Sequence, residues 1–176
     1  MPVVLETQRL RLRELGWEDL EPLAEILSDE ETMAHYPAPF DRAKVERWIS
    51  WNLENYRVFG FGLWAVEEKG SGAFLGDCGI TIQNIDGAFR PEIGYHINKR
   101  FWRRGYGSEA ACACRDWAFA HTPFGEVYSY MKKTNLASRA TAMANGMELV
   151  KEYEEKDGGT HLVYAITKAR WEGLRI

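Results

Sequence analysis

One stretch of the chain decides its fold: residues 92–110, Glu-Ile-Gly-Tyr-His-Ile-Asn-Lys-Arg-Phe-Trp-Arg-Arg-Gly-Tyr-Gly-Ser-Glu-Ala. It begins with an apolar alternation at Ile93, Tyr95 and Ile97, which is typical of a strand. A basic loop follows, and Gly105 and Gly107 then open a long helical pattern. The cations of this loop are Lys99, Arg100, Arg103 and Arg104. Because N–H groups at a helix N-terminus bind phosphate, the stretch predicts a strand–loop–helix unit that holds a pyrophosphate.

Two other phosphate-binding motifs compete with this interpretation. The P-loop string Gly-x-x-x-x-Gly-Lys-Ser/Thr does not occur in the sequence. Gly105, Gly107 and Ala110 do fit a dinucleotide fingerprint, and Glu126 lies where that motif has its ribose-binding acid. Against it, residues 98–104 separate the strand from the glycines, and the upstream strands are predicted to be antiparallel rather than part of a βαβ unit. A plain glycine turn with solvated arginines remains a third alternative, because Gly-x-Gly alone is a weak signal.

The composition is ordinary for a globular protein. The chain has 176 residues, of which 45% are hydrophobic and 27% charged, so we expect one domain over residues 1–176. The formal net charge of −4 argues against bulk electrostatic binding to nucleic acid or anionic membranes. No apolar run reaches the roughly 20 residues of a membrane span. Residues 1–6 lack a signal-peptide pattern, and we therefore expect a cytoplasmic protein.

The cysteines give a similar indication. An odd number of them, Cys78, Cys112 and Cys114, fits a reducing compartment. Cys112 and Cys114 lie two positions apart on a predicted helix, so they face different directions and no metal site is expected. We predict that both are core residues. No cysteine is placed to carry an acyl group as a nucleophile.

The periodicities predict an α/β (α+β) fold with a mixed, mostly antiparallel sheet of about seven strands and four flanking helices. The expected strands are residues 9–13, 62–67, 73–83, 90–97, 126–131, 149–156 and 160–168. The expected helices are residues 17–28, 42–57, 105–121 and 137–144. The order is therefore β-αα-βββ-α-β-α-ββ, with tight turns at 69–72, 86–87 and 157–159.

The region 90–120 resembles the acetyl-coenzyme-A-binding motif of the GNAT N-acetyltransferase superfamily, Gln/Arg-x-x-Gly-x-Gly/Ala. Residues 102–107, Trp-Arg-Arg-Gly-Tyr-Gly, match this motif except at the first position. A tryptophan there is typical of the branch of ribosomal-protein N-terminal (Rim-type) acetyltransferases. Other segments of that branch are similar in order: residues 6–13 to its opening strand, residues 92–95 to its fourth strand, and Asn135-x-x-Ser138 with Gly146 to a later segment. The similarity runs from about residue 5 to residue 172.

This resemblance implies a binding site for acetyl-coenzyme A (acetyl-CoA). In the family the fourth and fifth strands diverge and the pantetheine arm lies between them, here between residues 90–97 and 126–131. Main-chain contacts would come from Tyr95, His96 and Ile97. The pyrophosphate cradle would be formed by Trp102, Arg103, Arg104, Gly105, Tyr106, Gly107 and Ser108. Asn135 would contact the cofactor arm, although a helix-capping role is an alternative and both can hold.

The resemblance also bears on catalysis. Many family members protonate the leaving thiolate with a tyrosine seven residues after the asparagine, but here that residue is Ala142. The Rim-type branch offers Ser138 instead, whose alternative role is that of a hydroxyl at a helix start. Glu92 and His96 are four positions apart on one predicted strand, so their side chains point to the same face of the sheet. We expect Glu92 to be the base or the group that orients the amine. Further candidates for the acceptor site are His35, Tyr36, Trp48 and Trp51.

We therefore expect an N-acetyltransferase that moves acetyl from acetyl-CoA to a primary amine by direct, ternary-complex transfer. The leading hypothesis for the acceptor is a protein N-terminal α-amino group. The sequence does not identify the particular substrate. A non-catalytic acyl-CoA-binding module and an NAD-binding protein remain alternatives. The expected partners are the amine substrate and, at most, a second copy, since the sequence does not separate a monomer from a homodimer.

Overall fold

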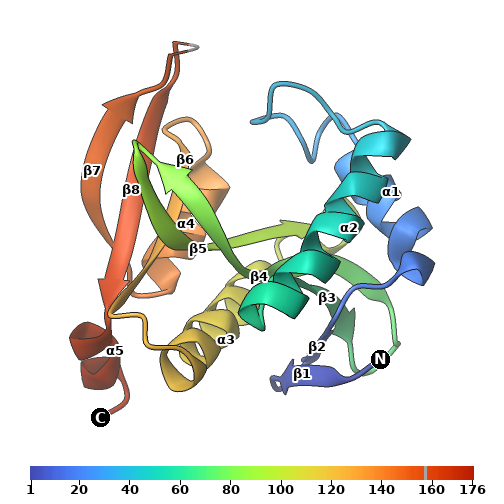
Figure 1. Ribbon diagram of the computed structural model, residues 1–176, viewed down its shortest axis with the longest axis horizontal. Helices are drawn as coiled ribbons and strands as arrows, with labels where there is room; N and C mark the ends of the chain where they lie inside the picture. The colour runs from blue at the N-terminus through green and yellow to red at the C-terminus, as the bar shows by residue number, and fades with distance from the viewer. Residues whose placement is uncertain (157) are drawn as a thin grey trace.

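The backbone is built around one open sheet in a computed structural model that describes residues 1–156 and 158–176. The sheet has eight strands in the order β1-β2-β3-β4-β5-β6-β8-β7. The strands are β1 (Val3–Glu6), β2 (Leu10–Arg13), β3 (Leu63–Glu68), β4 (Phe74–Ile85), β5 (Ala88–Ile97), β6 (Glu126–Lys132), β7 (Glu148–Glu154) and β8 (Thr160–Thr167). Neighbours pair antiparallel, apart from the parallel pair β5–β6. The expected mixed, mostly antiparallel sheet is confirmed (Figure 1).

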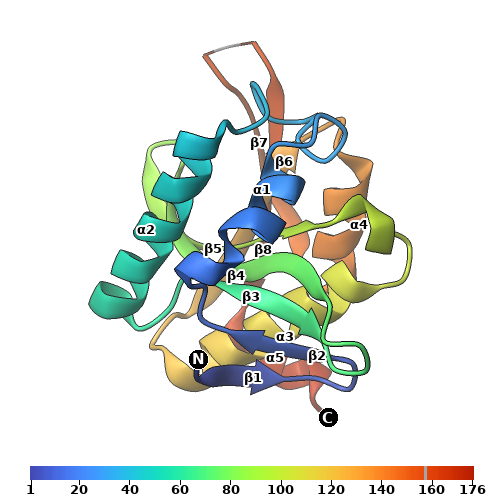
Figure 2. The same ribbon diagram turned by 90° about the vertical axis from the view of Figure 1, so that its right-hand side faces the viewer.

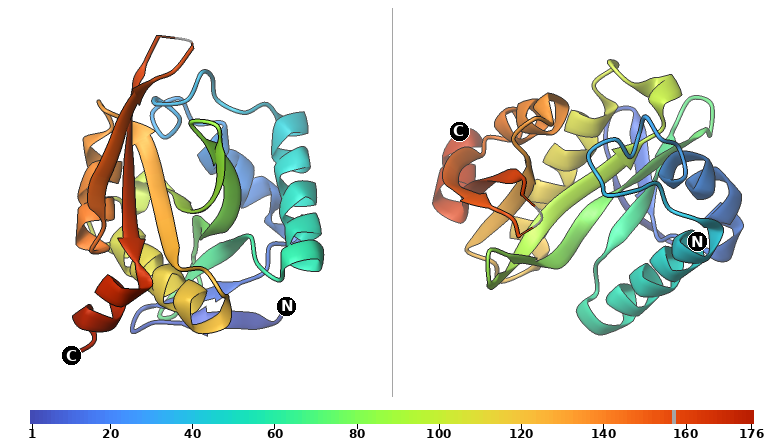
Figure 3. Two further views of the ribbon diagram at one scale, coloured as in Figure 1. Left: turned by 60° about the vertical axis from the view of Figure 1, so that its left-hand side comes forward. Right: turned by 90° about the horizontal axis from the view of Figure 1, so that it is seen from above.

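Helices cover both faces of this sheet. They are α1 (Leu20–Leu27), α2 (Arg42–Phe59), α3 (Tyr106–His121), α4 (Leu136–Ala144) and α5 (Lys168–Leu174). Figures 2 and 3 show α1 and α2 on one side of the sheet and α3 and α4 on the other. Small buried residues of α3, including Ala110, Ala111 and Ala118, let that helix lie close to the strands. In the described part of the chain, no helix has the length and apolar character that crossing a membrane requires.

Two elements were not predicted, β1 and α5. Residues 6–13 do not form one opening strand, because Thr7 N donates to Leu10 O at 2.9 Å and turns the chain. β1 therefore folds back on β2 as a short edge strand, too short for a clear period. α5 is held by Trp171, whose Nε1 donates to Asp116 Oδ1 at 2.7 Å. Of the predicted turn 157–159, Asp157 lies outside the described residues.

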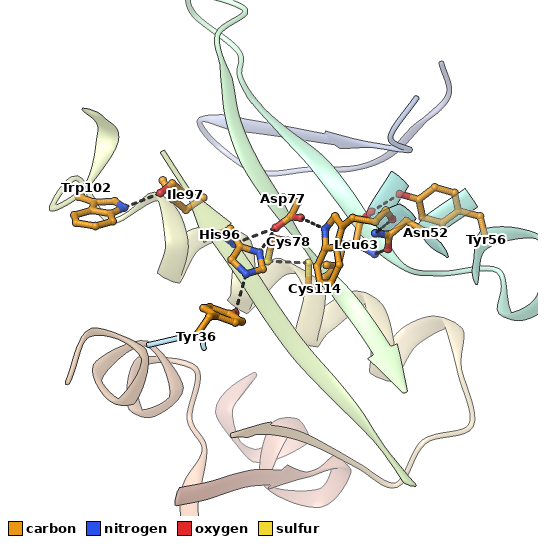
Figure 4. Close-up of polar contacts among 11 residues, drawn as sticks. Tyr36, Asn52, Tyr56, Leu63, Asp77, Cys78, His96, Ile97, Trp102 and Cys114 are labelled. Atoms are coloured by element: carbon orange, nitrogen blue, oxygen red, sulfur yellow. Dashed lines mark hydrogen bonds and ion pairs between the residues drawn. The ribbon is translucent and has the colours of Figure 1, made fainter. Parts of the chain in front are cut away.

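The connection between α1 and α2 is fixed at both ends. Ser28 Oγ donates to Phe40 O at 2.6 Å, which closes the base of this loop, residues 28–41. α2 is in turn bound to β3, because Asn52 Oδ1 accepts from Leu63 N at 2.8 Å and the Tyr56 hydroxyl donates to the Leu63 carbonyl (Figure 4). Loop 28–41 consequently stays beside the central strands, and Figure 3 shows it passing over β5 when seen from above.

The parallel pair β5–β6 is the opening in the sheet. Its register contains one matched pair, Glu92 with Tyr128, and Ser129 Oγ also donates to Ile93 O at 2.9 Å. Beyond this point residues 94–97 of β5 pair with β4 but, among the described residues, with no residue of β6. The two strands therefore diverge, as the resemblance implied.

Candidate active site

Two cavities meet where β5 and β6 diverge. The first, of about 500 Å³, is lined by Glu92 and is called the Glu92 cavity below. The second, of about 550 Å³, is lined by residues 101–103 and 105–108 and is called the loop cavity. Seven residues line both cavities: His35, Tyr36, Tyr95, His96, Asn135, Ser138 and Thr141. This shared wall is where two reactants, one in each cavity, would meet.

The loop cavity is built around the N-terminus of α3. Arg103 and Gly105 both have left-handed backbone angles, with φ of 63° and 77°. The alternation of such residues with ordinary ones turns successive N–H groups toward one point. The first-turn N–H groups of α3, which begins at Tyr106, have no acceptor within the helix and lie at its positive end. This backbone geometry is suited to an anion, so the anion cradle stays a prediction.

The two glycines of the motif have different roles. Gly105 supplies the positive φ just before α3. Gly107 is helical, and what it supplies is space, since a Cβ there would lie 3.2 Å from Cε2 of Tyr95. The ring of Tyr95 can therefore pack against the start of α3, and its hydroxyl reaches α4, where it donates to Thr141 Oγ1 at 2.9 Å.

Only two of the four loop cations are available to a ligand. Lys99 Nζ lies 2.7 Å from Asp29 Oδ1, and Arg100 Nη2 lies 3.1 Å from Glu25 Oε1. These acids come from α1 and the segment after it, so the sequence alone did not reveal the pairing. Arg103 and Arg104 form no ion pair with any of the described residues.

Trp102 and Asn135 each have a structural contact. Trp102 Nε1 donates to Ile97 O at 2.7 Å, which ties the loop to the end of β5. Asn135 Oδ1 accepts from Ser138 N at 3.2 Å, so the capping role predicted as an alternative is present. Both cavities also reach Asn135, and its amide nitrogen donates to no residue that the structure describes.

The main chain of β5 presents alternate residues to the gap. Ile93 O faces β6 through Ser129, so the main-chain groups of Tyr95 and Ile97 face the same way. His96 differs from the expectation. Its N–H donates to Asp77 Oδ1 at 3.1 Å, and its carbonyl lies so close to Gly76 that a Cβ there would be 1.8 Å away. The main chain of His96 faces β4, and its side chain faces the cavities.

Glu92 lies in the wall of the cavity named after it. Its side chain is deeply surrounded by protein yet reaches the cavity, which keeps it partly accessible. Burial raises the pKa of Glu92 to about 8. Such a carboxyl exchanges protons readily near neutral pH, as a general base must.

A hydrogen-bonded series of side chains crosses the shared wall (Figure 4). The Tyr36 hydroxyl lies 2.7 Å from His96 Nε2, and His96 Nδ1 lies 2.8 Å from Asp77 Oδ1. Asp77 is fully buried and also accepts from Trp48 Nε1 at 2.9 Å. Sequence analysis missed Asp77. The available signal was an acid within a strand of buried residues, which implies buried partners.

Comparison with known proteins agrees with this geometry. Residues 9–148 match the acetyltransferase (GNAT) domain family. The uncharacterized protein YkkB of Bacillus subtilis is 37% identical over 148 residues, which cover 84% of this chain and 86% of that protein. An acetyltransferase of Agrobacterium tumefaciens superposes with a TM-score of 0.82 at 27% identity, covering 96% of this chain and 95% of that one. RimL, a ribosomal L7/L12 alpha-N-protein acetyltransferase solved with coenzyme A, has a TM-score of 0.78 at 16% identity, covering 94% and 98%.

The chain belongs to the GNAT acetyltransferase family, with RimL-type enzymes among its structural neighbours. It is an acetyl-CoA-dependent N-acetyltransferase. The strands upstream of the motif are antiparallel, as predicted, but β5, α3 and β6 do form a βαβ unit, so this observation does not count against the dinucleotide fingerprint. The family match and the long connection between Ile97 and Gly105 separate this site from a dinucleotide fold.

Proposed function

We propose that this enzyme acetylates the α-amino group of a peptide or protein. The acceptor would enter the Glu92 cavity and acetyl-CoA the loop cavity, with transfer at the wall they share. The observation that carries the proposal is the place of Glu92, which lines a cavity that shares a wall with the loop cavity; burial there raises the pKa of Glu92 to about 8. An α-amino group titrates near 7.7–8.0 and a lysine near 10.4, so the α-amino group matches this carboxyl far better. The name of RimL, an alpha-N-protein acetyltransferase of the same fold, supports the same choice.

The residues for acetyl-CoA line the loop cavity, apart from Arg104, which lies between two lining residues in the chain. We assign the pyrophosphate to the cradle of Trp102, Arg103, Arg104, Gly105, Tyr106, Gly107 and Ser108. Arginine contacts to phosphate are charge-assisted and strong. The main chain of Tyr95, the N–H of Ile97 and the amide of Asn135 suit the amide groups of the pantetheine arm, whereas the Ile97 carbonyl already accepts from Trp102 Nε1. The thioester would then lie near the shared wall.

Glu92 and Ser138 are the proposed catalytic residues. Glu92 accepts a proton from the incoming ammonium, which frees the nitrogen lone pair for attack on the thioester carbonyl. Ser138 lines both cavities and donates a hydrogen bond to the sulfur as the carbon–sulfur bond breaks. Neither described lining includes a cysteine, which supports direct transfer to the amine.

An acceptor screen tests the proposal by following coenzyme A release. The probes are an alanine–glycine hexapeptide with a free N-terminus, the same peptide N-acetylated and carrying one lysine, spermidine, and kanamycin. We expect the free N-terminal peptide to have the highest kcat/KM. Equal values for the two peptides, or turnover of spermidine or kanamycin alone, would refute the α-amino assignment and leave the transferase activity intact.

A further inference from the structure

The reaction proposed above has an unassigned proton. An acceptor amine arrives as an ammonium ion and must lose two protons from its nitrogen before it is a neutral amide. Glu92 removes the first, before attack. The second leaves after the carbon–nitrogen bond has formed, when the nitrogen again carries a positive charge. In the same step the departing sulfur needs a proton, which Ser138 cannot supply on balance because a serine alkoxide is far less stable than a thiolate.

Tyr36 occupies the position that this proton transfer requires. It lies in loop 28–41 and lines both the Glu92 cavity and the loop cavity. Its ring packs against His96, with ring centroids 5.5 Å apart, and against Phe40 at 6.4 Å. Tyr36 is 41% exposed as a residue, whereas its hydroxyl lies 2.7 Å from His96 Nε2. A tyrosine hydroxyl at this site can contact a nitrogen in one cavity and a sulfur in the other.

Asp77 determines which ring nitrogen of His96 carries the hydrogen. The Asp77 carboxylate accepts from His96 N at Oδ1 and from Trp48 Nε1 at Oδ2, and Oδ1 also lies 2.8 Å from His96 Nδ1, so one hydrogen lies between these two atoms. Nδ1 of His96 therefore carries a hydrogen, and in the neutral imidazole Nε2 accepts the hydroxyl hydrogen of Tyr36. The lone pairs of the Tyr36 oxygen are then left to accept from a donor in the cavity. An ammonium-like N–H is such a donor.

We propose that Tyr36 is a catalytic residue that carries the second amine proton to the leaving sulfur, with His96 and Asp77 as its positioning residues. This inference rests on the proposed function for the location of the acceptor. Nitrogen gives its proton to the Tyr36 oxygen while the hydroxyl hydrogen moves to His96 Nε2, and Asp77 stabilises the imidazolium. The carbon–sulfur bond breaks and its electron pair goes to sulfur. His96 then returns its proton through Tyr36 to the thiolate. The amide, the thiol of coenzyme A and one proton on Glu92 complete the balance.

The surroundings of Tyr36 fit a proton carrier rather than an ionised phenolate. Burial, with the nearby carboxylates of Glu92 and Asp77, raises the pKa of Tyr36 well above its usual range. The hydroxyl therefore stays protonated between turnovers, and its proton moves only in concert with the one it receives. The arrangement has the same logic as a serine–histidine–aspartate triad, in which a buried acid fixes the tautomer of the imidazole.

The test begins with Tyr36→Phe, which removes the hydroxyl and keeps the ring. Loss of a general acid–base group costs about 100-fold or more in kcat, and we expect that loss here. The KM values and the acetyl-CoA dissociation constant should stay within about threefold, because the proton moves only in the transition state. Tyr128→Phe is the matched control, since Tyr128 is on β6 outside both cavities, and it should keep full kcat. A kcat of Tyr36→Phe within about threefold of wild type, or a loss confined to KM, would overturn the proposal.

A second variant distinguishes proton transfer from packing. His96→Ala should lower kcat as much as Tyr36→Phe, and added imidazole should restore it. Restoration should be weaker with 4-fluoroimidazole, which is similar in size but much less basic. Equal restoration by both would make His96 a space-filling residue and overturn the relay. If His96→Ala does not fold, Tyr36→Phe decides alone.

The relay and the acceptor assignment can fail separately. The wild-type enzyme is first given the alanine–glycine hexapeptide, the N-acetylated lysine peptide and spermidine. Which of these it prefers tests the proposed function. The ratio of variant to wild-type kcat is then measured on whichever amine is turned over, and that ratio tests Tyr36.

Discussion

Arg9 Nε lies 2.7 Å from Glu109 Oε2, so the residue that precedes β2 is bound to the first turn of α3. Arg9 also donates from Nη1 to Arg104 O at 2.9 Å and lies over the Tyr106 ring at 4.4 Å. Burial alone would raise the pKa of Glu109, but hydrogen bonds from Thr7 and Arg9 outweigh it and the pKa is lowered. The carboxylate is therefore charged beside the proposed phosphate site, and Arg9 offsets its repulsion of an anion.

We predict that Arg9→Ala weakens acetyl-CoA binding. The pair is partly exposed, and such pairs are worth up to about 1 kcal/mol, so the dissociation constant should rise by about fivefold. The double variant Arg9→Ala/Glu109→Gln should recover most of the lost affinity, because the Glu109 carboxylate that repels the phosphate is then absent. Calorimetric titration with acetyl-CoA measures the dissociation constants of both variants. Arg11→Ala, which breaks the exposed pair with Glu6, is the control and should change the constant little. Equal effects of Arg9→Ala and Arg11→Ala would contradict the role given to Arg9.

The two free arginines of the loop should contribute more. Arg103→Ala and Arg104→Ala should each weaken acetyl-CoA binding by about 1–3 kcal/mol through lost charge-assisted contacts. The loss should shrink in high salt, because screening weakens the contact in the wild type. Arg100→Ala is the control from the same loop, since Arg100 pairs with Glu25. If Arg100→Ala is as damaging as Arg103→Ala, the phosphate is not held where we place it.

The sequence was sufficient for the fold because the decisive signals are local. The alternation at Ile93, Tyr95 and Ile97, and the glycines at the start of α3, report directly on neighbouring backbone. β1 was missed because an edge strand of four residues has little burial pattern. α5 was missed because it depends on the distant contact of Trp171 with Asp116.

The site was predictable only where its residues belong to one motif. Residues 102–103 and 105–108 line one cavity, and Glu92 lines the adjoining one, whereas Arg104 lines neither. The partners of His96 lie far from it in sequence, Tyr36 in the α1–α2 loop and Asp77 on β4, so no spacing rule joins them. The pairing of Lys99 and Arg100 with acids before α2 was hidden for the same reason.

Glu92 should make both stability and rate depend on pH. The folded-state pKa of about 8 lies above the ordinary value of 4.5, so the folded protein binds more protons than the unfolded chain between these values. The free energy of unfolding should therefore fall as the pH rises from about 4.5 to about 8. Glu92→Gln removes this pH dependence. The melting temperature of the variant, relative to that of the wild type, should therefore rise as the pH increases. Melting curves from pH 5 to pH 9 measure the difference.

The same variant should alter the pH–rate profile. In the wild type, kcat/KM for the peptide should rise with a limb near pH 8 as Glu92 ionises. In Glu92→Gln the acceptor must lose its proton unaided, so kcat should fall and activity should need a higher pH. Glu155→Gln, at a second carboxylate that lines the same cavity, is a comparison that removes a charge without removing the base. An unchanged profile in Glu92→Gln would exclude Glu92 as the proton acceptor.

Ser138 provides the last prediction, because its backbone and its hydroxyl have separate tasks. Its N–H donates to Asn135 Oδ1 and caps α4, a contact that survives any side-chain change. Its hydroxyl lies at the shared wall beside Tyr95, whose pKa burial raises although hydrogen bonds to Thr141 and Ser138 lower it. Ser138→Ala should therefore leave the fold and acetyl-CoA affinity near wild type. It should lower kcat by about 10- to 150-fold, because a hydrogen bond to a charged group is worth about 1.5–3 kcal/mol and only the transition state has the developing thiolate. Thr141→Val, on the next turn of α4, removes the other hydroxyl bound to Tyr95. If Thr141→Val lowers kcat and Ser138→Ala does not, the hydrogen bond to the leaving sulfur comes from Tyr95 rather than from Ser138.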